Sequence, residues 1–330
     1  CARLVTRGLR HAVDRSLIVH RLNVALALRE KLFDAPYYRL VYGESDGLPG
    51  LVLDRYGDVI VGQIATAGME ALKEEVRAAV KKSLSPRALV WKNAGSLRSL
   101  ESLPESVEVA FGELPAETIV EEGGVRFAID PLHGQKTGWF YDQRENRRFV
   151  AGLARGQDVL DVYSYCGGFA LTAASGGAVS VTAVDGSAAA LDLGAASAAR
   201  QGVGETVRFE RADAFAFLDQ AAVAKTRFGL VIADPPAFVK SRKDLGAGLK
   251  GYRKLARLAA GVVSEPGFLC LGCCSHHVTA EQFAAEAWAG IREAGRGGRL
   301  IRSAGAGPDH PIHPGLPETA YLKFLAYALD

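Results

Sequence analysis

The chain has 330 residues, which at roughly 150 residues per domain predicts about two domains. With 48% hydrophobic and 23% charged residues, it is neither an intrinsically disordered nor a fibrous protein. The formal net charge of +2 says little about partners, and no run of about 18 apolar residues predicts a membrane span. Five cysteines and a first segment without an apolar signal sequence favour the reducing cytoplasm.

Residues 1–125 have the pattern of a small α+β domain. Apolar residues recur at helical spacing after Asp14, which is a plausible N-cap, whereas residues 38–66 form short β-like runs separated by glycine turns. The elements expected here are a helix at 14–33, strands within 38–66, a helix at 69–83, a strand at 86–92, a linker or loose edge at 95–115, and a β pair at 118–130.

From about residue 137 the chain alternates between short apolar runs and helical segments, which predicts a parallel, doubly wound Rossmann-like sheet in a second domain at 126–330. Runs that are mostly or wholly apolar, such as Val159–Val162 around Asp161 and Gly229–Ala233, suit strands buried on both faces. The expected strands are 158–164, 179–185, 206–213, 228–236, 267–275, 298–303 and 320–328, and the expected helices are 140–154, the segment after 167, 187–202, 214–222, 249–263 and 280–294.

Ligands of a doubly wound sheet bind at the carboxyl ends of its strands. We expect a nucleoside cofactor there, because a carboxylate follows each of the first four strands, but no G-x-G-x-x-G pattern indicates a pyrophosphate. The candidates are Asp161, Tyr163, Ser164, Gly167, Gly168 and Phe169 after the first strand, Asp185 for the ribose, Asp213 and Ala214 for the adenine, and Asp234 after the fourth strand. This combination resembles the class I S-adenosylmethionine-dependent methyltransferases, although each aspartate alone could be a helix cap.

The strand at 267–275 ends in a cluster of cysteines. Alternation places Cys274 at the open strand end beside Asp234, and Cys273 on the other side. A thiolate there could add to carbon 6 of a cytosine and activate carbon 5 for methylation, with Asp234 stabilising charge on the ring, and a nearby helix start or histidine could lower the thiol pKa. Two alternatives stay open: a zinc site and ordinary core packing. The zinc site would use Cys270, Cys273, Cys274, His276 and His277. Core packing is the preferred interpretation for Cys270, whereas for Cys166 and Cys273 packing and a functional role are equally open.

Five ordered runs give a closer resemblance, to the RlmI family of cytosine carbon-5 methyltransferases that act on large-subunit (23S) ribosomal RNA. The runs are DGLPGLVLDRYG, QKTGWFYDQRENR, LDVYSYCGGFAL, DPPAFVKS and CCSHHV. The resemblance covers nearly the whole chain and implies a PUA domain, missing or truncated here, a central RNA-binding α+β domain (EEHEP-like) and a methyltransferase domain. It also implies that Lys136, Thr137, Gly138 and Phe140 line the cofactor pocket, with Asp142 and Arg144 nearby, and that Cys274 is the nucleophile. Ala237 stands where some RNA cytosine methyltransferases have a second cysteine, so a two-cysteine release is not possible at that position.

Residues 240–257 carry seven cations against one anion, Asp244, and the chain start is also basic. Such a segment suits RNA phosphates, although it could be a solvated helix face. The best candidates for phosphate contacts are Lys240, Lys243, Lys250 and Arg253, and the basic residues at the start are Arg3, Arg7, Arg10, Arg15 and Arg21. Phe238 and Tyr252 could stack on a flipped base or simply pack.

The expected cofactor is therefore S-adenosylmethionine, with S-adenosylhomocysteine as product, and the expected partner is ribosomal RNA. We expect no membrane and no metal ion, and a homodimer is left open. Two other functions are not excluded by the sequence: methylation of another base such as guanine, and a catalytically inactive RNA-binding module.

Overall fold

A computed structural model describes residues 5–6 and 12–330 and divides the chain into two compact units. Unit 1 contains Cys1–Glu122, Ala128–Asp142 and Gly307–Thr319, and unit 2 contains Gly123–Phe127, Gln143–Ala306 and Ala320–Asp330. Each unit therefore combines segments that are distant in the sequence. The domain boundary expected between residues 125 and 126 stays a prediction. Arg3, Arg7 and Arg10 of the basic start lie outside the described residues.

Unit 1 is built on a five-stranded sheet in the order β1-β2-β3-β4-β5. All neighbouring strands run antiparallel except β3 and β4, which are parallel. The strands are β1 (Tyr37–Tyr42), β2 (Leu51–Tyr56), β3 (Val59–Ile64), β4 (Ala88–Asn93) and β5 (Ser106–Gly112), and the helices are α1 (Arg15–Leu32), α2 (Ala67–Glu70), α3 (Lys73–Leu84) and α4 (Ser96–Leu100).

The first helix forms where the sequence predicts it. The Asp14 carboxylate accepts a hydrogen bond from the Leu17 amide at 3.1 Å and so caps α1. Ile18, Leu22 and Ala25 then form a buried stripe at helical spacing, which joins the core of unit 1. The β pair at 118–130 is also confirmed, as β6 (Thr118–Glu122) and β7 (Val125–Ile129).

Residues 95–115 are an edge of the sheet rather than a linker. β5 pairs antiparallel with β4, so the backbone groups along one side of β5 are hydrogen-bonded to the sheet. Its side chains are largely exposed, which explains why the segment shows no buried alternation in the sequence. The loose-edge interpretation is therefore confirmed and the linker interpretation is wrong.

Unit 2 contains a seven-stranded sheet in the order β10-β9-β8-β11-β12-β14-β13. Its strands are β8 (Asp158–Val162), β9 (Ser180–Asp185), β10 (Val207–Arg211), β11 (Phe228–Ala233), β12 (Val263–Cys273), β13 (Gly298–Ala304) and β14 (Lys323–Leu329). β8 to β12 pair in parallel, whereas β14 lies between β12 and β13 and is antiparallel to both. The predicted doubly wound α/β fold is confirmed, and the strand order switches direction between β8 and β11.

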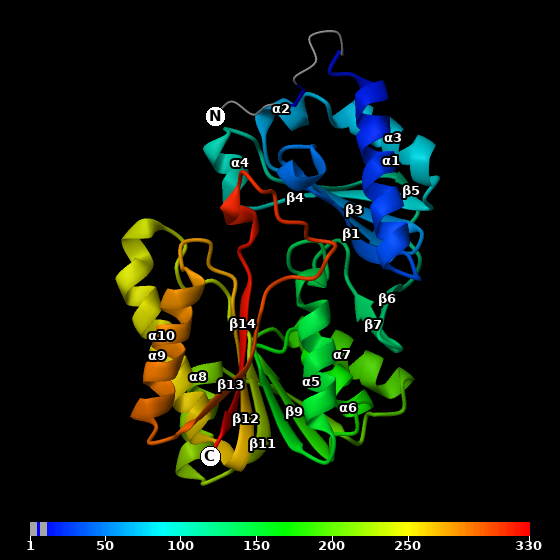
Figure 1. Ribbon diagram of the computed structural model, residues 1–330. Helices are drawn as coiled ribbons and strands as arrows, with labels where there is room; N and C mark the ends of the chain where they lie inside the picture. Colours follow the sequence, from blue (N-terminus) through cyan, green and yellow to red (C-terminus); the bar gives the residue numbers. More distant parts are fainter. Residues whose placement is uncertain (1–4, 7–11) are drawn as a thin grey trace. The chain divides into compact units, whose positions relative to one another are not determined.

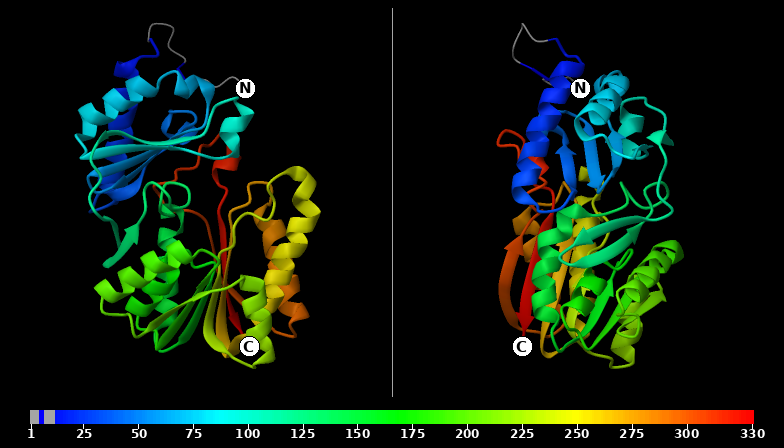
Figure 2. Two further views of the ribbon diagram at one scale, coloured as in Figure 1. Left: turned by 180° about the vertical axis from the view of Figure 1, so that it is seen from behind. Right: turned by 90° about the vertical axis from the view of Figure 1, so that its right-hand side faces the viewer.

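Helices cover both faces of this sheet (Figures 1 and 2). The helices are α5 (Arg144–Ala154), α6 (Gly168–Ser175), α7 (Ala188–Arg200), α8 (Ala214–Val223), α9 (Leu245–Gly261) and α10 (Ala280–Glu293). α5 to α7 lie on one face and α8 to α10 on the other, where α9 and α10 pack together. Within the part of the chain that the structure describes, no helix combines the length and apolarity needed to cross a bilayer.

Candidate functional site

The carboxyl ends of the parallel strands of unit 2 meet at one edge of the sheet. Asp161 lies near the end of β8, Asp185 is the last residue of β9, and Asp234 directly follows β11. Cys274 directly follows β12, the neighbour of β11. The edge therefore brings together carboxylates and a thiol from four strands.

Asp161 is the most deeply buried of these carboxylates, with 0% of its surface exposed. Its Oδ2 accepts a hydrogen bond from the Ala170 amide in the first turn of α6 at 3.0 Å, whereas its Oδ1 has no partner among the described residues. Burial raises the pKa of Asp161 well above its usual value, and the nearby carboxylates of Asp234 and Asp185 raise it further against the opposing charge of Arg147. A buried acceptor without a partner is costly in an apo protein and suits a bound polar ligand.

The turn between β8 and α6 has an unusual backbone. Tyr163, Tyr165 and Gly167 all adopt positive φ, at 64°, 51° and 78°. A Cβ on Gly167 would also approach the Phe209 ring to 3.1 Å, so the position suits glycine on both grounds. Ser164 is buried in the same turn, and its Oγ is without a hydrogen-bond partner in the described chain. The turn thus presents a second unsatisfied polar atom at the start of α6.

Asp185 and Asp213 are both used in local hydrogen bonds. Asp185 accepts from the amides of Tyr165 at 2.9 Å and Ser187 at 2.8 Å, and is half-buried. Asp213 is exposed and caps α8 by accepting from the Ala216 amide at 2.9 Å. Burial raises the pKa of Tyr163, and the charge of Asp213 adds to the shift. The helix-cap role is therefore present at Asp213, and the ribose and adenine roles stay predictions.

Three other predicted residues at this edge belong to the packed part of unit 2. Phe169 is almost fully buried and stacks on Phe324 with ring centroids 6.1 Å apart. Gly168 is the first residue of α6, and Ala214, buried, is the first residue of α8. These residues place backbone at the site, and their contact with a cofactor stays a prediction.

The four pocket residues expected from the resemblance belong to unit 1. The Thr137 hydroxyl donates to Oδ2 of Asp54 at 2.5 Å, and the same carboxylate is paired with Arg39 at 2.8 and 2.9 Å. Lys136 has a φ of 49° and holds its ammonium 4.5 Å from the Phe140 ring centroid. Gly138 has a φ of 118°. The segment is therefore well fixed within unit 1, and its role in a cofactor pocket stays a prediction.

Asp234 is held by residues that sequence reasoning missed. Gln143 donates from Nε2 to Oδ2 of Asp234 at 2.8 Å, and Asn146 donates to Oε1 of Gln143 at 2.6 Å. Gly272 lies near the end of the neighbouring parallel strand β12, and a Cβ there would lie 2.1 Å from Oδ1 of Asp234. A glycine within an otherwise apolar strand was the available signal of a close approach. Nothing in the pattern around Gln143 and Asn146 indicates their partner, which is 91 residues from Gln143.

Cys274 is the most accessible of the cysteines that the structure describes. Cys166, Cys270 and Cys273 are buried, whereas Cys274 is half-buried and its thiol lies 3.8 Å from the Pro235 carbonyl oxygen. Burial raises the pKa of Cys166 to about 12 and also raises that of Cys270, so neither thiol is reactive at neutral pH. Cys273 packs into the core against the α8–α10 layer, as alternation along β12 predicts. No group of three or more candidate metal ligands occurs within residues 5–6 and 12–330.

A hydrogen-bonded network fixes the turn that follows Cys274. The Ser275 Oγ lies 2.8 Å from the Tyr252 hydroxyl and accepts from the Val239 amide at 3.2 Å. The Lys323 ammonium donates to the main-chain oxygen atoms of Ser275 and Tyr321, at 2.6 and 2.7 Å. Tyr252 is 2% exposed and packs on Phe238, so the packing alternative is confirmed for Tyr252.

The basic segment lies on the loop after β11 and on α9. Lys240, Lys243 and Lys250 are exposed, as phosphate contacts require. Arg253 instead donates to Glu286 of α10 at 2.6 Å and lies 3.5 Å from Glu293. Its charge is thus largely compensated within the α9–α10 pair.

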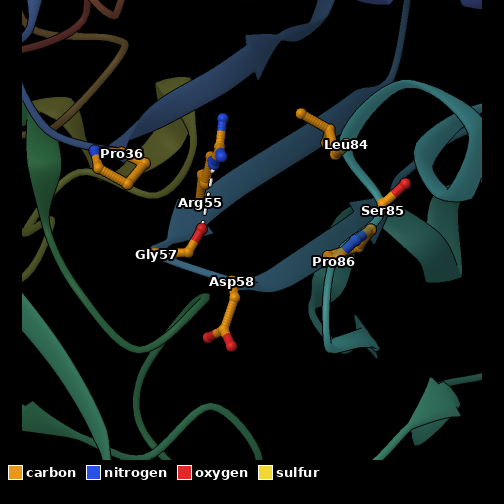
Figure 3. Close-up of a pocket in the computed structure, with 7 residues that line it drawn as sticks. All are labelled: Pro36, Arg55, Gly57, Asp58, Leu84, Ser85 and Pro86. Atoms are coloured by element: carbon orange, nitrogen blue, oxygen red, sulfur yellow. Dashed lines mark hydrogen bonds between the residues drawn. The ribbon is translucent and has the colours of Figure 1, made fainter.

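A separate hollow of about 350 Å³ opens in unit 1 (Figure 3). It is lined by Pro36, Arg55, Gly57, Asp58, Leu84, Ser85 and Pro86. The Arg55 guanidinium donates to the Gly57 carbonyl oxygen at 3.0 Å and to the Tyr38 hydroxyl at 3.1 Å. The Arg55 guanidinium in this hollow is therefore already hydrogen-bonded within the protein. The carboxyl edge of the unit 2 sheet remains the better candidate for a catalytic site.

Comparisons with known proteins identify the family of the chain. The family model of the S-adenosylmethionine-dependent methyltransferases matches residues 95–313. The chain is 34% identical to a protein of Aeromonas hydrophila named ribosomal RNA large subunit methyltransferase I, over 98% of this chain and 83% of that protein. It is 35% identical to a ribosomal RNA large subunit methyltransferase of Deinococcus radiodurans, over 99% of this chain and 83% of the relative.

Solved structures share the fold. A Streptococcus mutans protein assigned as a SAM-dependent methyltransferase superposes with a TM-score of 0.86 at 22% identity, over 98% of this chain and 84% of that one. A second methyltransferase structure, solved in complex with SAH, gives a TM-score of 0.85 at 20% identity with the same coverage. Together with the family model and the sequence identity, this assigns the chain to the S-adenosylmethionine-dependent methyltransferase family that includes the proteins named ribosomal RNA large subunit methyltransferase I.

Proposed function

We propose that the chain methylates carbon 5 of a cytosine in large-subunit (23S) ribosomal RNA, through a covalent bond between Cys274 and the base. The names of its relatives support the RNA substrate, since Aeromonas and Deinococcus proteins of 34% and 35% identity are named for the large-subunit ribosomal RNA. The observation that carries the choice of base is the half-buried Cys274 thiol beside the Asp234-Pro235 segment. Methylation of a guanine nitrogen needs no thiol at this place.

The residues fit the expected cofactor. Asp161 Oδ1 and Ser164 Oγ are buried acceptors that a polar ligand would satisfy, and Asp185 reaches the same edge from β9. We propose that Asp161, Ser164 and the turn at Gly167 hold the methionine part, with Asp185 at the ribose and Asp213 at the adenine. When bound, S-adenosylmethionine supplies an electrophilic methyl group on a sulfonium.

The protein residues supply the rest of the reaction. The Cys274 thiolate adds to carbon 6 of the cytosine, and the electrons of the carbon 5–carbon 6 double bond become available at carbon 5. Asp234 lies next to this position and can hold the ring near N3 or the exocyclic amine, because Gln143 fixes one of its oxygens. After methylation, a base takes the carbon 5 proton, the electrons of that bond restore the carbon 5–carbon 6 double bond, and the thiolate leaves, which regenerates Cys274.

RNA carrying 5-fluorocytosine tests this function directly. Fluorine at carbon 5 cannot leave as a proton does, so a chain that works by this route becomes trapped on the RNA once methyl transfer has occurred. We expect a covalent, cofactor-dependent adduct that disappears in Cys274→Ala and persists in Cys270→Ala, whose thiol is buried in β12. The adduct should migrate as a larger species on a denaturing gel and map to the peptide that contains Cys274.

The controls distinguish the alternatives. An adduct that survives Cys274→Ala but is lost in Cys273→Ala would move the nucleophile to the neighbouring residue. A methylated RNA without any adduct would favour another base, such as guanine. Failure to bind S-adenosylhomocysteine in calorimetry would favour an inactive RNA-binding module.

A further inference from the structure

Lys323 is a buried cation next to the proposed nucleophile. It is 8% exposed, and its Cα pairs with that of Cys273 across the antiparallel β12–β14 ladder. Its ammonium donates to the carbonyl of Ser275, the residue that follows Cys274, and to the carbonyl of Tyr321. A lysine is rarely buried without a function or a partner, because desolvation of an ammonium is costly.

The partners that the structure gives this ammonium do not neutralise it. Two of its acceptors are main-chain carbonyls, which carry no net charge, and its other neighbour is the Cys273 thiol, which is neutral until it ionises. Burial lowers the pKa of Lys323, and the thiols of Cys273 and Cys274 act in the opposite direction when they ionise. The positive charge of Lys323 would therefore stabilise a thiolate at these cysteines.

The other ionisable groups near the turn lie on α9, directly after β11 and beside the ends of β12 and β14. Tyr252 of α9 reaches Ser275, and burial followed by the charge of Cys273 raises its pKa, so it stays a neutral phenol. Asp234 follows β11, and His276 stacks on Tyr321 with ring centroids 4.9 Å apart. Thr279 begins α10 as its N-cap, so the positive end of that helix dipole also lies near the turn.

We propose that Lys323 is a positioning residue that stabilises the Cys274 thiolate and fixes the turn that carries it. The inference rests on the proposed function in that it takes Cys274 as the nucleophile. Lys323 does not touch the base in this role. It acts through the main chain of residue 275 and through its charge.

The rate of Cys274 alkylation by iodoacetamide as a function of pH tests the proposal without RNA or cofactor. Mass spectrometry of the modified peptide separates Cys274 from the buried thiols of Cys270 and Cys273. In the wild-type chain we expect a midpoint below the ordinary thiol pKa of about 8.5. In Lys323→Met the midpoint should rise by about one pH unit, which lowers alkylation about tenfold at neutral pH, and Lys323→Arg should keep most of the wild-type behaviour.

Lys225→Met is the matched control, because Lys225 is an exposed lysine after α8. A purely structural role would loosen the turn and speed alkylation without raising the midpoint. A folded Lys323→Met chain with an unchanged midpoint overturns the proposal. A wild-type midpoint at or above about 8.5 does so too, even where Lys323→Met does not fold. An absent 5-fluorocytosine adduct with a Lys323-dependent midpoint would instead refute the proposed function alone.

Discussion

Both units bury a carboxylate completely, but they treat it differently. In unit 1, Asp54 receives two hydrogen bonds from Arg39 and one from Thr137. In unit 2, Asp161 receives one from the Ala170 amide, and its second oxygen has no partner within the described residues. The first arrangement is complete without a ligand, whereas the second leaves a desolvated acceptor, so the contrast separates a structural charge from one arranged for binding.

The largest effect should come from breaking the complete arrangement. Asp54→Ala removes the carboxylate paired with Arg39, whose side chain is 11% exposed, and we expect a loss of about 3–5 kcal/mol in the free energy of unfolding. Urea denaturation followed by tryptophan fluorescence measures it, because Trp91 and Trp139 both lie in unit 1. Glu74→Ala, which removes an exposed partner of Arg77, should cost less than about 1 kcal/mol. Equal losses in the two variants would refute the contrast.

Breaking the incomplete arrangement should affect binding rather than stability. Asp161→Asn should weaken S-adenosylhomocysteine binding at least about tenfold, or about 1.4 kcal/mol, as measured by calorimetry. Because the pKa of Asp161 is raised in the folded state, the folded chain holds this proton over a range in which the unfolded chain has lost it. Wild-type stability should therefore fall as pH rises above the unfolded pKa of about 3.9, up to the folded pKa.

Asp161→Asn should remove that slope, which a series of melting curves at different pH would show. Asp158→Asn is the matched control on the same strand, since Asp158 is exposed and accepts a hydrogen bond from the Ser180 hydroxyl. Unchanged cofactor affinity in Asp161→Asn would contradict the binding role.

Asp234 offers an intermediate case, a carboxylate that accepts a hydrogen bond from Gln143 and lies against the bare Cα of Gly272. Gly272→Ala would put a Cβ 2.1 Å from Oδ1, so the carboxylate must move. Because a misplacement of about 1 Å can cost about 10²-fold in rate, we expect adduct formation with 5-fluorocytosine RNA to slow at least tenfold. Gly261→Ala is a control in α9, where a Cβ meets no described atom within 4 Å. Similar rates in the two variants would remove Asp234 from the mechanism.

The smallest effect concerns exposed charges. Lys243→Ala should lower RNA affinity modestly and reduce the slope of log affinity against log salt by about one, the value for one phosphate contact. Arg253→Ala should change the slope less, because Arg253 is already paired with Glu286. Filter binding at several salt concentrations measures both. A slope that responds to Arg253 but not to Lys243 would reverse this assignment.

Local signals in the sequence were enough for most elements of the fold. Asp14 and a helical apolar stripe predict α1, and short, largely apolar runs that alternate with helical segments predict the parallel strands of unit 2. The strand-end rule also brings Asp161, Asp234 and Cys274 to one edge before any coordinates are known. These predictions succeed because each depends on neighbouring residues or on a general property of parallel sheets.

The contacts that complete the site could not be predicted in this way. The bond from Gln143 to Asp234 and that from Lys323 to Ser275 join residues 91 and 48 positions apart. The second depends on β14 running antiparallel between β12 and β13, which no local pattern specifies. Likewise, the pairing of Arg253 with Glu286 follows from how α9 packs on α10, and a charge count along the chain cannot reveal it.

The position of β14 has a consequence for how the chain folds during synthesis. β13 is made before β14 yet pairs with β14, so it has no place in the sheet until the later strand has left the ribosome. The turn after Cys274 likewise receives the Lys323 ammonium only at that stage. A nascent chain that lacks residues 323–329 would expose the open edge of β12, so this side of the sheet is completed only when β14 has been made.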